Sequence, residues 1–235
     1  MRILAADDDL VSRLAMEDVL RQCGAPEIVL AEDGAAAWQR LSGDECFDLV
    51  CLDVRMPPPD GLELVARLRA TPALKRVPAM LITSTADRDT VLGATRSDLQ
   101  GFIVKPVGAD TVGRIVRVLA QLDAGILEPV EPAIARLRVD AERHARYVGA
   151  FRQQIQSLHG LALELASAAG GAHARAGFTQ KADACRTAAL TLGSPRIEQL
   201  ISDALALLAA DAPGSERAMG QARYWLERVA AAQRH

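Results

Sequence analysis

Residues 49–70 read LVCLDVRMPPPDGLELVARLRA, and this stretch indicates the fold of the first half of the chain. A short apolar run, Leu49–Asp53, is followed by a proline-rich turn and then by a helix-length segment, Gly61–Ala70. Short apolar runs bounded by turn residues are typical of strands buried on both faces of a parallel sheet. Four more runs of this kind occur in the first half of the chain: Arg2–Ala6, Glu27–Ala31, Ala79–Thr83 and Gly101–Val104.

Helix-length segments alternate with these runs. Besides Gly61–Ala70, they are Asp9–Cys23, Gly34–Leu41, Asp87–Arg96 and Asp110–Leu122. Strands that alternate with helices predict a doubly wound α/β fold with a five-stranded parallel sheet over residues 1–123. Asp9 is expected to cap the first helix.

The second half of the chain has a different pattern. Glycine and prolines interrupt residues 124–133, which predicts a linker. Over residues 134–235, apolar residues recur at helical spacing, and Ser194-Pro195 and Pro213-Gly214 mark helix boundaries. Several amphipathic helices with short connections predict an all-α antiparallel helical bundle.

The composition excludes several classes of protein. The chain has 235 residues, a formal net charge of −3 and 3% aromatic residues, so no basic excess favours nucleic acid or an anionic membrane as a partner. No apolar run approaches the ~18 residues of a membrane span, and the start, MRILAADDD, does not resemble a signal peptide. The cysteines, which show no close pairing, favour a cytoplasmic protein with free thiols: Cys23, Cys46, Cys51 and Cys185.

Polar side chains follow the predicted strands at their carboxyl ends. Asp7 and Asp8 follow the first strand, Asp53 ends the third, Thr83 ends the fourth and Lys105 follows the fifth. Ligands of an open parallel sheet bind beyond the carboxyl ends of its strands, so these residues are expected to converge. Clustered carboxylates need a compensating charge, and Mg²⁺ with oxygen ligands supplies it beside a phosphoryl group. A carboxylate held there can act as a nucleophile on phosphorus, while the ammonium group neutralises the phosphoryl oxygens.

This set of residues resembles the receiver domain of response regulators. The resemblance covers residues 1–123 and rests on separated elements in the family's order: Asp7-Asp8, Asp53, Met56-Pro57, Asp60-Gly61, Thr83 and Lys105-Pro106. It implies that Asp53 is the phosphoacceptor, that Asp8 and Asp53 bind Mg²⁺ directly, and that Asp7 binds it through water. The backbone carbonyl of Arg55 would complete the metal site. Pro58-Pro59 departs from the family's loop and should stiffen it.

The resemblance also implies a switch. Thr83 would move toward the phosphoryl group, and Phe102 would change its side-chain rotamer in response.

A second resemblance concerns residues 182–193, ADACRTAALTLG. This segment is similar to the phosphoacceptor helix of histidine-containing phosphotransfer domains, but Asp183 stands at the histidine position, Arg186 at the lysine position and Thr187 at the glycine position. A carboxylate is a poor substitute for a neutral imidazole here, because its product would be another unstable acyl phosphate. The resemblance therefore implies a pseudo-phosphotransfer bundle that serves as a docking surface.

These observations predict a signalling protein and not an enzyme, apart from its own phosphorylation and dephosphorylation. A histidine kinase or phosphotransfer protein would phosphorylate Asp53, and the helical half would contact a downstream protein. One alternative is a phosphorelay through another histidine: His144, His159 or His173. Another is an interaction scaffold that does not depend on phosphorylation, and a homodimer also remains open. Arg136, Arg138, Arg143 and Arg146 form either a solvated helix face or a docking stripe for an acidic partner.

Overall fold

The chain divides into two compact units, Met1–Ala120 and Gln121–His235. The computed structural model describes residues 1–43, 45–84, 99–167 and 172–232 of these units.

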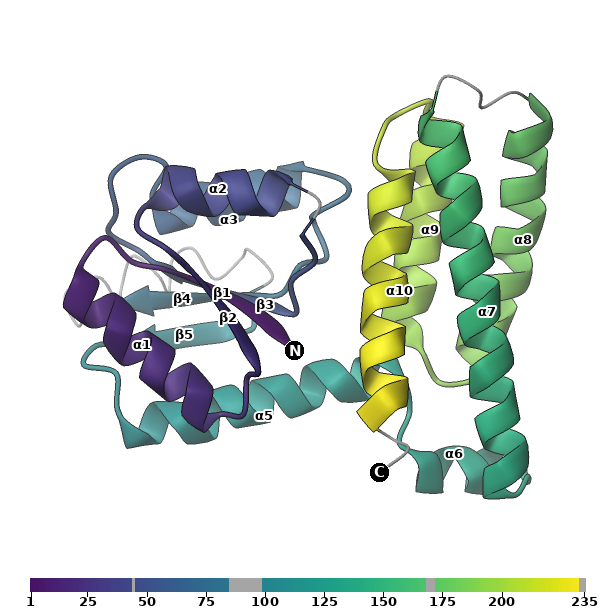
Figure 1. The fold of residues 1–235 in the computed structure, drawn as a ribbon, viewed down its shortest axis with the longest axis horizontal. Coiled ribbons are helices and arrows are strands. Elements are labelled where there is room, and N and C mark those ends of the chain that lie inside the picture. Colours follow the sequence, from purple (N-terminus) through teal and green to yellow (C-terminus); the bar gives the residue numbers. More distant parts are fainter. Residues whose placement is uncertain (44, 85–98, 168–171, 233–235) are drawn as a thin grey trace. The chain divides into compact units, whose positions relative to one another are not determined.

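The first unit is built on a parallel sheet whose strand order is β2-β1-β3-β4-β5 (Figure 1). All five predicted strands are confirmed, with the predicted bounds: β1 (Arg2–Ala6), β2 (Glu27–Ala31), β3 (Leu49–Asp53), β4 (Ala79–Thr83) and β5 (Gly101–Val104). Every residue of β3 and of β4 is buried, as expected for strands covered on both faces. The carboxyl ends of β1, β3, β4 and β5 therefore meet at one edge of the sheet.

Helices cover both faces of this sheet. In Figure 1, α2 (Gly34–Ser42) and α3 (Gly61–Ala70) lie on one face, and α1 (Leu10–Gln22) and α5 (Ala109–Ile126) lie on the other. The doubly wound α/β prediction is thereby confirmed. The helix predicted over Asp87–Arg96 lies outside the described residues.

A polar side chain fixes the start of α1 and of α3. The carboxylate of Asp9 accepts a hydrogen bond from the backbone amide of Ser12 at 2.8 Å, which confirms the predicted cap of α1. Asp60 and Glu63 form a reciprocal capping box at the start of α3. Only residues 54–60 separate the end of β3 from the start of α3, so the loop between them is short and tightly held.

The predicted linker over 124–133 is wrong at most of its positions. α5 continues past the expected end at Leu122 to Ile126, and α6 (Val130–Leu137) begins soon after it. Ile126 is fully buried in the core of the second unit, and this burial favours the additional helical turn. Pro132 lies in the first turn of α6, where a backbone amide has no helical partner, so it does not interrupt that helix.

The second unit is an antiparallel bundle, as predicted (Figure 1). Its long helices are α7 (Ala141–Ala166), α8 (Ala172–Thr191), α9 (Pro195–Ala209) and α10 (Ser215–Ala232). The core contains three large aromatic side chains, Phe151, Phe178 and Trp225, each at most 1% exposed. Ser194 precedes α9 as predicted, but its hydroxyl donates to the backbone carbonyl of Ile126 and accepts no hydrogen bond from a backbone amide of α9.

Within the described parts of the chain, no helix is both long enough and apolar enough to cross a membrane.

Candidate functional site

The acidic side chains predicted at the sheet edge do converge. One carboxylate oxygen from each of Asp7, Asp8 and Asp53 lies within 4.8 Å of the others. Asp7 and Asp53 are buried, at 2% and 4% exposure, whereas Asp8 is exposed. β1 and β3 are neighbours in the sheet, so the residues that end or follow them are necessarily close.

Lys105 lies between two of these carboxylates. Its Nζ is 2.9 Å from Oδ2 of Asp7 and 2.7 Å from Oδ1 of Asp53. The backbone amide of Lys105 donates to the carbonyl of Thr83 at 2.8 Å, which extends the pairing of β4 and β5 by one residue and directs the lysine back over the edge. The predicted ammonium group is therefore in contact with the predicted phosphoacceptor.

Backbone amides hold the remaining carboxylate oxygens. The amide of Arg55 donates to Oδ2 of Asp53 at 2.9 Å, and the amide of Asp9 donates to Oδ1 of Asp7 at 3.0 Å. Because both oxygens of Asp53 have a donor, the orientation of its carboxylate is fixed. Arg55 thus contacts Asp53 through its backbone amide. The role of the Arg55 carbonyl as a metal ligand stays a prediction.

Burial and charge oppose each other in this cluster. Burial raises the pKa of the Asp53 carboxyl, and although Lys105 acts in the opposite direction, the pKa remains above its usual value. Burial also lowers the pKa of the Lys105 ammonium, but its hydrogen bonds and ion pairs with Asp53 and Asp7 outweigh that effect, so its pKa is raised. The ammonium group is firmly protonated and available to neutralise negative oxygens.

The donor set fits a hard divalent cation. Three carboxylates stand against one lysine, which leaves net negative charge at the site. Oδ2 of Asp7 is buried, and Nζ of Lys105 lies 2.9 Å from it. Carboxylate oxygens gathered in this way are the hard ligands that Mg²⁺ prefers. Asp7, Asp8 and Asp53 are therefore the residues that would hold it.

The two predicted switch residues lie on the neighbouring strands β4 and β5. Thr83 is fully buried, and its hydroxyl donates to the backbone carbonyl of Ser84 at 3.1 Å. Phe102 is half-buried on β5, opposite Leu81 of β4. The guanidinium of Arg114 lies 6.0 Å from the centre of its ring and donates to its backbone carbonyl at 2.7 Å.

Sequence reasoning missed two supporting residues. Arg13 donates to the backbone carbonyl of Asp7 at 2.6 Å and so fixes the end of β1, but no motif marks an arginine at that position. Gly61 was matched only as part of a loop. A Cβ atom at Gly61 would lie 2.1 Å from the backbone oxygen of Asp53, so only glycine lets α3 begin this close to the acidic site. The sequence signal that could have revealed this role is the glycine directly after the helix cap Asp60.

The segment predicted as a degenerate phosphotransfer helix lies on α8. Asp183 is exposed there and pairs with Arg186, three residues later on the same helix, at 3.7 Å. Arg186 also pairs with Glu198 of α9 at 3.1 Å, a contact that the sequence did not indicate. Of the histidines, His144 is buried and His159 is half-buried, and the side chain of His173 lies outside the described parts.

Comparisons with known proteins agree with the geometry of the first unit. Residues 3–117 match the family model described as the response regulator receiver domain. The chain is 35% identical over 112 residues to the chemotaxis protein CheY-3 of Vibrio cholerae, covering 48% of this chain and 85% of that protein. It is 32% identical over 112 residues to the chemotaxis protein CheY of Pseudomonas aeruginosa, covering 48% of this chain and 90% of that protein.

A solved structure gives a similar alignment. The receiver domain of AraT, a response regulator from Geobacillus stearothermophilus, is 24% identical, with a TM-score of 0.46, and the match covers 52% of this chain and 95% of that one. The family model ends at residue 117 and says nothing about the helical unit.

Proposed function

Because the N-terminal half of the chain belongs to the response regulator receiver family, we propose that this protein accepts a phosphoryl group on Asp53 in a Mg²⁺-dependent way and signals through its helical unit. The observation that supports this most directly is the contact of Lys105 with Asp53 inside a cluster of three carboxylates.

The phosphoryl donor would be a phosphohistidine of a kinase or phosphotransfer protein. An Asp53 carboxylate oxygen attacks the phosphorus, an O–P bond forms and the N–P bond to the imidazole breaks. The electron pair of that bond stays on the imidazole nitrogen. Bound Mg²⁺ would neutralise charge on the transferring oxygens. Lys105 is placed to donate hydrogen bonds to the same oxygens, and the Arg55 amide keeps the attacking carboxylate oriented.

A small donor tests this proposal without a kinase. With acetyl phosphate and Mg²⁺, the wild-type chain should gain one phosphoryl group, measured by intact mass, and chelation of Mg²⁺ should prevent the gain. Asp53→Asn should remove it. Asp60→Asn is the matched control, because it makes the same change in the same loop and asparagine caps helices as well as aspartate does. Equal labelling of wild type and Asp53→Asn would reject the proposal.

For the helical unit we propose protein contact without phosphotransfer. The residue at the phosphoacceptor position, Asp183, is a carboxylate paired with Arg186, and His144 is only 2% exposed. A downstream protein would then read the state of the receiver through this unit. If the contact did not respond to Asp53→Asn or to removal of Mg²⁺, the scaffold alternative would replace this proposal.

Of the histidines open to the relay alternative, His159 is half-buried and can be tested directly. Burial and the nearby Arg223 lower its pKa, so its imidazole is neutral and nucleophilic at neutral pH. A phosphorylated helical unit would carry acid-labile, base-stable phosphate that His159→Gln removes. Absence of such phosphate after incubation with a phosphorylated receiver would exclude this alternative.

A further inference from the structure

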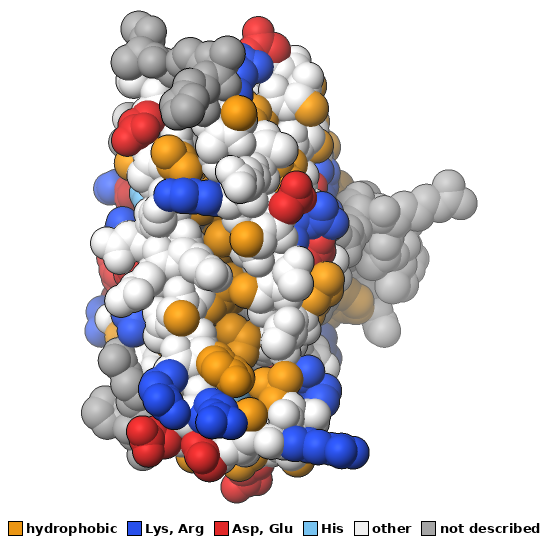
Figure 2. All heavy atoms as spheres, turned by 90° about the vertical axis from the view of Figure 1, so that its right-hand side faces the viewer, with side chains coloured by type: hydrophobic (Ala, Val, Ile, Leu, Met, Phe, Trp, Pro, Cys, Tyr) orange, Lys and Arg blue, Asp and Glu red, His pale blue; other side chains and the backbone are white. Residues whose placement is uncertain are grey.

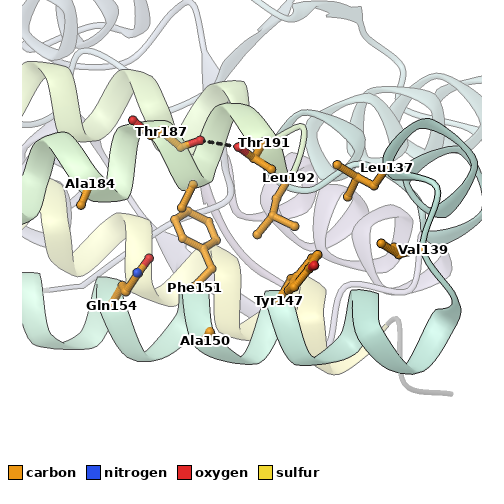
Figure 3. A pocket seen from close by; sticks show the side chains of 11 residues that line it. Leu137, Val139, Tyr147, Ala150, Phe151, Gln154, Ala184, Thr187, Thr191 and Leu192 are labelled. Atoms are coloured by element: carbon orange, nitrogen blue, oxygen red, sulfur yellow. Dashed lines mark hydrogen bonds between the residues drawn. The ribbon is translucent and has the colours of Figure 1, made fainter.

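An apolar groove opens on the helical unit between the end of α6 and the facing sides of α7 and α8. Its volume is about 550 Å³, and Figure 3 shows its side chains converging from the three helices. Three alanines, Ala150, Ala184 and Ala188, leave space between larger neighbours. The other lining residues are Leu137, Val139, Tyr147, Phe151, Gln154, Thr187, Thr191 and Leu192. A cavity of ~150 Å³ already holds a benzene-sized group, so this groove has room for several aliphatic side chains.

Basic residues stand within four positions of residues that line the groove. Arg138, Arg143, Arg146 and Lys181 are all exposed. Within the described part of the chain, none of the four has an ion-pair partner, although Lys181 bonds the hydroxyl of Ser157 at 3.0 Å. In Figure 2, hydrophobic side chains gather along the middle of the lower half of this face, and Lys and Arg side chains lie on both sides of them. The occupant should therefore be apolar in the middle and acidic at its edges.

The receiver unit carries a surface with that chemistry. On α1, Leu10, Val11 and Leu14 are 58%, 74% and 48% exposed, which is unusual for large hydrophobic side chains that follow one another on one helix face. We call these three residues the α1 stripe. Exposed carboxylates stand at both of its ends, Asp9 before it and Asp18 one turn after it. Within the described residues, neither of these acids forms an ion pair.

We propose that the α1 stripe of one chain docks in the groove of a second copy of this chain. The stripe supplies helical apolar anchors for an apolar groove, and its flanking acids match the unpaired arginines and lysine around that groove. Stripe and groove are different surfaces, so the contact is head-to-tail. If two copies each dock their stripe in the groove of the other, they form a closed dimer. If each copy docks on the next one, they form an open filament.

The contact would also affect access to the acidic site. α1 begins directly after Asp7 and Asp8, so a second copy docked on the stripe competes with any partner protein that approaches the site along α1. A small donor such as acetyl phosphate is not subject to this competition. The proposal therefore goes beyond phosphorylation of Asp53 and can fail separately from it.

Sedimentation velocity of the full chain tests the proposal. The average mass should rise with protein concentration above that of one chain, and added salt should weaken the association, because exposed charge pairs are screened. Val11→Asp in the stripe and Ala150→Glu in the groove should each weaken association by at least about tenfold, because each places a charge in an apolar contact. The matched control is Leu163→Asp, a change at a 52% exposed leucine on α7 outside the groove, and it should associate as wild type does.

Mixing the two variants separates this arrangement from others. The Val11→Asp chain keeps its groove and the Ala150→Glu chain keeps its stripe, so the mixture should recover association through one contact per pair. An average mass equal to that of a single chain at all concentrations would overturn the proposal. Docking of the α1 stripe in the groove of the same chain would also overturn it. Wild-type association of either variant, or no recovery on mixing, would overturn it too. Acetyl phosphate labelling of Ala150→Glu should equal that of wild type, which keeps this test independent of the proposed function.

Discussion

The most direct structural test of the acidic site is the substitution Gly61→Ala. The added Cβ atom would lie 2.1 Å from the backbone oxygen of Asp53, 2.9 Å from its carbonyl carbon and 3.2 Å from Cα of Val54. All three atoms belong to the backbone, so no flexible side chain can move aside. α3 must therefore shift away from the end of β3, and Asp53 must move with the strand.

The expected cost follows from this overlap. Forcing an additional carbon atom into a packed site destabilises by about 1–3 kcal/mol. The matched control is Gly113→Ala on α5, because no atom lies within 4 Å of its added Cβ. This change should instead stabilise the receiver unit by about 0.5–1 kcal/mol, the usual difference between alanine and glycine in a helix.

Hydrogen exchange resolved by peptide is the appropriate assay, because the chain has two units and one unfolding curve would mix them. Gly61→Ala should speed exchange of β3 amides and leave those of α9 unchanged. Labelling by acetyl phosphate should slow by about tenfold or more, since a displacement of about 1 Å can cost ~100-fold. Wild-type exchange in β3 together with wild-type labelling would show that the close approach of α3 is not required.

Three further predictions concern buried groups. Phe178→Ala should destabilise the helical unit by about 3–5 kcal/mol, because Phe178 is fully buried. Urea unfolding followed by Trp225 fluorescence in a Trp38→Phe background measures this unit alone. Burial lowers the pKa of His159 from 6.5, so the folded unit binds fewer protons than the unfolded chain just below that pH. The stability of the unit should therefore fall as the pH drops through the range below 6.5, and His159→Gln should flatten this dependence. Burial raises the pKa of Cys51 to about 12, so a thiol reagent at pH 8 should modify Cys51 only after unfolding.

Each of these predictions has a control or a contrary result. Thr179→Ala changes an exposed residue next to Phe178 and should alter stability by no more than about 0.5 kcal/mol. A pH dependence that is the same in His159→Gln would assign the effect to other groups, and fast modification of Cys51 in the native chain would contradict its burial.

The receiver unit could be predicted closely because its topology leaves few choices. A parallel sheet brings the carboxyl ends of its strands to one edge, so once Leu49–Asp53 and its companions were read as strands, Asp7, Asp53 and Lys105 had to approach one another. Their contacts required no knowledge of loops. Gly61 and Arg13 could not be found in this way, because their importance depends on how closely α3 approaches β3 and on where one side chain of α1 turns back.

Helical periodicity gave less information about the second unit. It predicted the buried faces of α7, α9 and α10, but the end of α5 and the start of α6 depended on burial of Ile126 in the bundle, which is a tertiary effect. The proline at 132 was read as a break, although the first turn of a helix tolerates it. Packing between elements decides where such helices begin and end, and the spacing of apolar residues along the chain does not predict that packing.

The same limit applies to the function of the helical unit. On a sheet edge, chemistry is concentrated by topology, whereas any exposed helix face can carry an aspartate and an arginine three residues apart. The pair of Asp183 with Arg186 therefore has an ordinary structural explanation, strengthened by the contact of Arg186 with Glu198. What distinguishes this face is the adjoining groove, to which α8 contributes Ala184, Thr187 and Ala188. An apolar groove beside the pair of Asp183 with Arg186 offers a surface for binding. The occupancy of that groove, and not the chemistry of Asp183, is therefore the property that should decide what this unit does.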